Sequence, residues 1–289
     1  MLDNKTKGYI FSFLSAFLYA LDVPISKIYL DSVSSNELLF LMYLGSALGV
    51  FLFIMFSKSR KLLLRKDKVT SKIIMIIICD IFASLLITES LYYLPANVVS
   101  LMSVLEIVFT VIFASLMLGE KMSKNLILSA IFVTIGGILV SIDSYNCVIF
   151  SIFIVFTIIA TILWGIENNL TAKVSSNNPL VLVFYKCLAV SLFNLVFIIN
   201  KVNIHMLIQN YWYLLIIGFF VFGMSILFFA YATRYIGASR TSIIFSLSPI
   251  FSTVLSIIIF KNKVNNLFIV SLLFMLLGIY FTCFSKDKS

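Results

Sequence analysis

The stretch YLPANVVSLMSVLEIVFTVIFASLMLGEKMSKNLILSAIFVTIGG, from Tyr93 to Gly137, decides the fold because a diverged second copy of it runs from Tyr235 to Ile279. The shift that places Tyr93 on Tyr235 needs no gap over two apolar segments and the loop between them. It also pairs Ala96 with Ala238, Ser100 with Ser242, Leu105 with Leu247, Phe109 with Phe251, Lys121 with Lys263, Ser129 with Ser271 and Gly136 with Gly278. A constant offset of this length is typical of an internal repeat.

The composition excludes a soluble globular domain. The 289 residues are 62% hydrophobic and 11% charged, with a mean hydropathy of +1.12, whereas soluble domains are about half apolar and about a quarter charged. Apolar runs of roughly 20 residues, long enough to cross a bilayer as helices, recur along the chain. The first run carries Asp22 and Pro24 and lacks a small-residue cleavage site, so we expect a retained helix and not a signal peptide.

These runs predict an all-α integral membrane protein with ten transmembrane helices. The expected spans are residues 8–28, 37–57, 73–93, 96–118, 124–142, 147–169, 179–200, 211–232, 238–260 and 264–284. The fourth and ninth spans are five crossings apart and must run in opposite directions. We therefore predict a five-plus-five inverted repeat, with spans 1–5 in residues 1–143 and spans 6–10 in residues 144–289. Such repeats are an architecture of secondary transporters, whose site lies between the halves near the midplane.

The net charge of +9 reflects membrane topology. Basic residues gather in loops, above all in residues 58–72, and cytoplasmic loops carry such an excess. This pattern predicts a cytoplasmic-membrane protein with both termini in the cytoplasm, surrounded by lipid and without a nucleic-acid partner.

Several motifs carry a family resemblance. YYLPA (Tyr92 to Ala96), GEKM (Gly119 to Met122), the pair Gly136 and Gly137, and SPIFS (Ser248 to Ser252) resemble the drug/metabolite transporter superfamily, EamA type. The resemblance covers essentially the whole chain as two EamA units. It implies a ten-helix carrier of small metabolites, many of whose relatives export amino acids or other compounds.

Five acidic residues fall within expected spans, where a charge is costly and normally faces the bundle interior or a wet cavity. They are Asp22, Asp80, Glu89, Glu106 and Glu167. A proton-coupled or cation-binding carrier would use such groups; the alternative is that some hold helices together by hydrogen bonds.

Glu106 is the preferred coupling or binding residue. At 100° per residue, Ser100, Ser103, Glu106 and Thr110 form one polar stripe on an otherwise apolar helix, and we expect this stripe to face a cavity. The alternative for the hydroxyls is hydrogen bonding to carbonyls of their own helix. In the ninth span a second polar arc contains Ser242, Ser246, Pro249, Thr253 and Ser256. Pro249 is expected to bend a gating helix, although a fixed kink explains it equally well.

The sixth span ends in WGIENNLT, Trp164 to Thr171, which combines an aromatic ring, a carboxylate and two amides. Trp164 beside Glu167 and Asn168 suits an organic cation, by cation–π and ionic attraction. The alternative is an interfacial tryptophan with asparagines that cap the helix end. Aligning the first helices of the two halves places Asp22 on Glu167, so the two acids are candidates to approach each other.

Asp80 and Glu89 lie about 180° apart on one helix and cannot face the same cavity. Asp80 is the deeper of the two. Lys186 is the only deep base, and an ion pair with one of the acids is its cheapest arrangement. Tyr19, Tyr43 and Tyr185 are candidates to line the cavity, but in a chain with 29 Phe and 13 Tyr packing is the favoured interpretation.

Other functions lack the residues they need. The four cysteines have no metal-ligand spacing, and His205 is the only histidine, so neither a metal nor another cofactor is expected. No GxxxxGK[ST] loop occurs, so no ATP-driven pumping or ATPase partner is implied. A hydrolase site is equally unsupported.

The sequence therefore predicts a secondary active transporter, an exporter rather than an enzyme. Its substrate is a small zwitterionic or cationic metabolite, such as an amino acid or a quaternary amine, moved by alternating access with proton coupling. The alternatives are a passive channel and a membrane-embedded enzyme that acts on lipid. The oligomeric state is open between monomer and homodimer.

Overall fold

The computed structural model describes residues 3–56, 71–118, 124–143, 152–174, 179–236, 241, 244–245, 247–261, 264 and 266–283. Every regular element among these residues is a helix. In chain order the helices are α1 (Asn4–Tyr19), α2 (Asp22–Tyr29), α3 (Ser35–Met55), α5 (Ser71–Tyr93), α6 (Ala96–Met102), α7 (Leu105–Leu118), α8 (Lys124–Asp143), α9 (Ile152–Val174), α10 (Pro179–Ile198), α11 (Ile204–Tyr211), α12 (Tyr213–Gly218), the π-helix η2 (Phe219–Met224), α13 (Ser225–Ile236), α15 (Leu247–Phe260) and α16 (Asn266–Cys283).

The prediction of a multi-pass helical membrane protein is confirmed. Within the described residues, seven helical segments are long and apolar enough to cross a membrane. They are Asn4–Tyr29, Ser35–Met55, Ser71–Tyr93, Ala96–Met117, Ile152–Val174, Pro179–Ile198 and Tyr213–Ile236. Shorter apolar helices follow at Leu247–Phe260 and Asn266–Gly278. The count of ten crossings stays a prediction.

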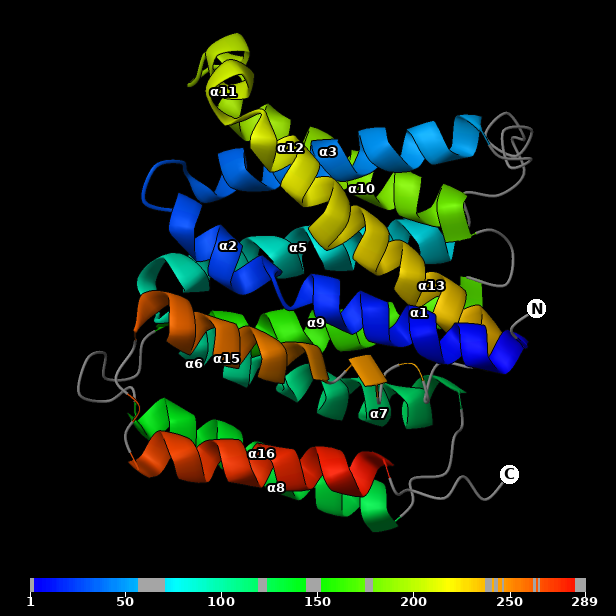
Figure 1. The fold of residues 1–289 in the computed structure, drawn as a ribbon, viewed down its shortest axis with the longest axis vertical. Coiled ribbons are helices and arrows are strands. Elements are labelled where there is room, and N and C mark those ends of the chain that lie inside the picture. Colours follow the sequence, from blue (N-terminus) through cyan, green and yellow to red (C-terminus); the bar gives the residue numbers. More distant parts are fainter. Residues whose placement is uncertain are drawn as a thin grey trace.

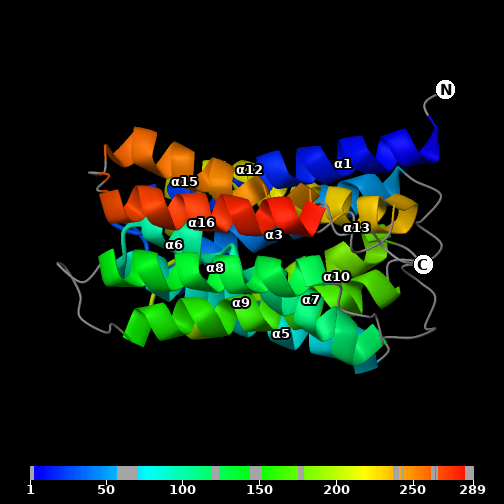
Figure 2. The same cartoon turned by 90° about the horizontal axis from the view of Figure 1, so that it is seen from below.

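The helices lie side by side across the long axis of the molecule (Figure 1). The helix α11 projects at one end of this axis, with the pair α3 and α10 next to it, and the pair α8 and α16 packs at the other end. Between them, α1 packs against α13, and α9 packs against both α5 and α7. The view from below places α1 and α15 on one face and α5, α7 and α9 on the opposite face (Figure 2). The first turn of α1 and the last turn of α16 lie at the same edge of the molecule.

Two spans that the sequence predicts as continuous are interrupted. The first breaks at Ala20 and Leu21, between α1 and α2. Pro24 has no N–H for the Ala20 carbonyl four residues earlier, which explains the break. The fourth span breaks at Ser103 and Val104, where the backbone hydrogen bonds shorten to the i→i+3 pattern.

The eighth span also departs from a regular helix. It passes through the π-helix η2 between α12 and α13, where the sequence predicts an uninterrupted α-helix. Just before this span the sequence predicts a loop, but the structure has the short helix α11, whose first turn is capped by the side chain of Asn203.

Small residues let α3 and α12 approach closely. A Cβ atom added at Gly45 would overlap the carbonyl oxygen of Leu215, and one at Gly218 would overlap that of Met42. The hydroxyl of Ser46 also donates to the Gly218 carbonyl at 2.7 Å. Close backbone contact through small residues is a usual way to pack helices within a membrane.

The replacement Gly45→Ala is expected to lower the thermal unfolding temperature of the purified protein and to destabilise it by about 1–3 kcal/mol, because the added methyl group overpacks this crossing. Alanine is otherwise the better helix former by about 1 kcal/mol. The control is Leu48→Ala on the same helix, at a side chain that is 51% exposed. An unfolding temperature for Gly45→Ala at or above the wild-type value would contradict the close crossing.

Candidate functional site

A buried ion-pair cluster joins three helices near the middle of the bundle. Lys186 of α10 donates from Nζ to Oε1 of Glu167 on α9 at 2.6 Å. The same Nζ lies 3.3 Å from Oδ2 of Asp80 on α5. All three side chains are buried. The lone deep base thus has two acidic partners, which confirms the ion pair expected for Lys186.

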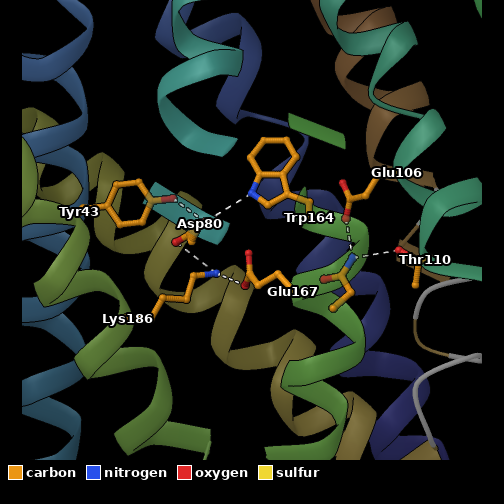
Figure 3. Close-up of polar contacts among 8 residues, drawn as sticks. Tyr43, Asp80, Glu106, Thr110, Trp164, Glu167 and Lys186 are labelled. Carbon is orange, nitrogen blue, oxygen red and sulfur yellow. Dashed lines mark hydrogen bonds and ion pairs between the residues drawn. The ribbon is translucent and has the colours of Figure 1, made fainter. Parts of the chain in front are cut away.

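Two aromatic side chains complete this cluster from the side of Asp80. The hydroxyl of Tyr43 donates to Asp80 Oδ1 at 3.2 Å, and the indole N–H of Trp164 donates to the same oxygen at 3.4 Å. The second of these bonds orients the Trp164 ring towards Asp80. In Figure 3 the ring lies between the cluster of Asp80, Glu167 and Lys186 and a second group around Glu106.

Glu106 receives its hydrogen bond from a neutral partner. The Asn168 amide of α9 donates to Glu106 Oε1 at 2.7 Å and lies 3.3 Å from the Thr110 hydroxyl (Figure 3). The neighbouring Asn169 donates to the Thr110 and Gly165 carbonyls, both at 2.9 Å. Both amides of the WGIENNLT motif therefore tie α9 to α7.

Two adjoining cavities open at these groups, and we name them cavity A and cavity B. Asp22, Glu106 and Asn168 are among the residues that line cavity A. Cavity B is bordered by Asp80, Glu167 and Lys186. The two cavities share part of their lining, namely Tyr19, Glu106, Trp164, Asn168 and Phe245.

Comparison with known proteins identifies the family. The profile of the EamA-like transporter family matches residues 6–142 and again residues 151–284. The chain belongs to the EamA-like transporter family. A solved structure described only as "Crystal structure of protein" is similar in fold, with a TM-score of 0.72, 12% sequence identity and coverage of 96% of either chain. No curated protein matches the chain.

The polar stripe predicted for the fourth span faces cavity A. Its lining includes the four residues of the stripe, Ser100, Ser103, Glu106 and Thr110. The 100° spacing along the helix predicts this. Ser103 also donates back to the Val99 carbonyl at 2.9 Å, so the alternative of self-bonding holds for that hydroxyl at the same time.

The polar arc predicted for the ninth span agrees with the structure only in part. Ser246 and Ser242 lie outside the described residues. Pro249 lines cavity A but is the third residue of α15, in a first turn whose N–H groups have no helical partner. Thr253 is buried and bonds back to the Pro249 carbonyl. Ser248 and Ser252, which the arc did not contain, line the cavity instead.

The remaining predicted acids fall into different positions. Asp22 is buried at the start of α2, lines cavity A and accepts a hydrogen bond from Ser26 at 3.0 Å. Glu167 lines cavity B, so the two acids border adjoining cavities rather than one. Glu89 is half-buried and borders neither cavity, as its opposition to Asp80 predicts.

The structure contradicts one of the two interpretations of Trp164. The ring is buried within the bundle, and α9 continues beyond the asparagines to Val174. The alternative prediction, an interfacial tryptophan followed by asparagines that cap the helix end, is therefore wrong.

Two of the three tyrosines for which packing was the favoured interpretation line the site instead. Tyr19 borders both cavities and Tyr43 borders cavity B, whereas Tyr185 borders neither. No group of three metal-ligating side chains occurs within the described part of the chain.

Removing the positive charge by Lys186→Met is expected to destabilise the protein by about 3–5 kcal/mol, because two buried carboxylates lose their ammonium partner. Thermal unfolding of the purified protein measures this. Lys201→Met, at an exposed lysine, is the control and should change little. The double variant Lys186→Met with Glu167→Gln should recover part of the loss; no recovery would count against the ion pair as the cause.

Proposed function

We propose that this EamA-family protein is a secondary active transporter that exports a small polar metabolite, such as an amino acid or an organic cation, by alternating access. The observation that carries the proposal is the position of cavity A. Its acids Asp22 and Glu106 come from the first matched region, and Trp164, Asn168 and Phe245 come from the second. A relative movement of the two halves would therefore change the shape of the cavity and its access to either side.

Helix packing supports an inverted repeat of residues 1–143 and 144–289. If the halves are related by a pseudo-two-fold axis, the contact of α1 with α13 exchanges with the contact of α9 with α5. Both contacts are present. The same axis would map the pairs α3–α10 and α8–α16 onto themselves, and both of these pairs also pack closely. Repeats of this kind rock around a site at their interface.

The location that we propose is the cytoplasmic membrane, with both termini in the cytoplasm. The lysines and arginines of residues 58–72 support this orientation. The chain acts as a monomer or homodimer in lipid, with no ATPase or nucleic-acid partner, and its partner in function is the transported small molecule.

Glu106→Gln is expected to reduce transport at least tenfold, because the variant removes a carboxylate from cavity A while keeping the size of the side chain. A thermal-shift screen of amines and amino acids first identifies a ligand that stabilises the purified protein. Counterflow of that ligand in its labelled form is then measured in proteoliposomes. Glu89→Gln is the matched control, since Glu89 borders neither cavity. Flux that does not saturate and shows no counterflow would indicate a channel.

Proton coupling predicts that a pH gradient across the proteoliposome membrane drives accumulation of the same ligand. The physical reason is that Asp22 and Glu106 accept only neutral hydrogen-bond donors among the described residues, so a proton and a cationic substrate can compete for them. Accumulation is measured with and without an ionophore that dissipates the gradient. Equal accumulation in both conditions would rule out coupling.

A further inference from the structure

The carboxylates that border the two cavities have different kinds of partners, charged for one pair and neutral for the other. In cavity B, Asp80 and Glu167 both lie within 3.3 Å of the Lys186 ammonium. Asp22 in cavity A, and Glu106, which borders both cavities, receive hydrogen bonds from the Ser26 hydroxyl and the Asn168 amide, which are uncharged. Cavity B therefore already contains a cation, covalently attached to α10, and cavity A does not.

The lining of cavity A offers no counter-charge for an anion. Among the described residues that line it there is no lysine, arginine or histidine. The amide of Asn168 is already engaged with Glu106 and Thr110. A carboxylate in this cavity would meet two buried acidic side chains in a low-dielectric environment, where repulsion between like charges is strong.

An aromatic wall borders the same space. The Tyr19 ring lies 5.2 Å from the Phe245 ring and 6.2 Å from the Trp164 ring, between centroids. All three side chains line cavity A. Aromatic faces attract organic cations when the site is shielded from water, and they also accommodate an apolar body. Small metal ions prefer oxygen ligands instead, so this lining favours an organic cation.

We infer that the transported substrate is an organic cation without a carboxylate, whose charged group binds beside Asp22 and Glu106 in cavity A, while Lys186 fills the acid pair of cavity B. This inference rests on the proposed transport function and narrows it, because it excludes free amino acids. Lys186 is a specificity-determining residue in this scheme. Because its ammonium group occupies the acid pair of cavity B, only cavity A can bind a substrate cation, one per chain.

Three probes with the same aromatic ring test the charge rule, namely that cavity A accepts an organic cation and rejects a carboxylate. They are benzyltrimethylammonium, phenylalanine and phenylacetate. The chain has 2 tryptophans, so Trp212→Phe, at a side chain 57% exposed, leaves Trp164 as the single tryptophan of the full-length protein, to be excited selectively over the tyrosines. Binding is followed by Trp164 emission, and calorimetry gives the number of sites. The variants are Glu106→Gln and Asp22→Asn, with Glu89→Gln as the control, and each is checked for folding by thermal unfolding.

The inference expects saturable binding of benzyltrimethylammonium at one site per chain, at least tenfold tighter than phenylalanine, with no binding of phenylacetate. Each cavity variant should weaken binding at least tenfold, and Glu89→Gln should change it less than twofold. Equal or tighter binding of phenylalanine or phenylacetate overturns the charge rule, and this comparison needs no variant to fold. Two cations per chain overturn the role of Lys186.

The outcome is distinguishable from a failure of the transport proposal. Cation binding in cavity A without counterflow in proteoliposomes would overturn transport and leave the cation site standing. Saturable counterflow of an amino acid, together with no binding of benzyltrimethylammonium, would overturn the cation site and leave transport standing.

Discussion

The contact on which the rest of the structure depends is the Lys186 ammonium held between Asp80 and Glu167. It joins α10, α5 and α9 in a region where an unpaired charge is costly. Because Asp80 also accepts from Tyr43 and Trp164, the ion pair positions an aromatic ring, that of Trp164, which borders both cavities. A polar cluster with this many partners favours one arrangement of the helices over its alternatives.

The interrupted spans explain how acids reach cavity A. Asp22 is the first residue of α2 and Glu106 the second residue of α7, so each carboxylate lies at the N-terminal end of a half-helix. That end carries partial positive charge, which stabilises a nearby anion. A continuous helix would bury the same carboxylates without this compensation.

The sequence was sufficient for the membrane class, the family and the cavity-facing stripe around Glu106, because these depend on composition, on motifs and on spacing along one short segment. The two partners of Lys186 were not predictable, since they depend on how α10 packs against α5 and α9. Pro24 was a visible reason for the break in the first span. The break at Ser103 and Val104 has no comparable signal, because neither residue prevents a helix. For Tyr19 and Tyr43 the abundance of aromatic residues favoured packing, since sequence spacing does not show which rings face the interior space.

The π-helix Phe219–Met224 brings Phe222 against Tyr43, with ring centroids 4.6 Å apart. Each hydrogen-bonded ring of a π-helix encloses one residue more than that of an α-helix. The eighth span thus behaves as a helix into which a single residue has been inserted without lengthening either loop. A sequence alignment of this span with a relative that has a regular α-helix needs a one-residue gap between 219 and 224. Without that gap, every residue on one side of η2 is aligned with the wrong residue of the relative.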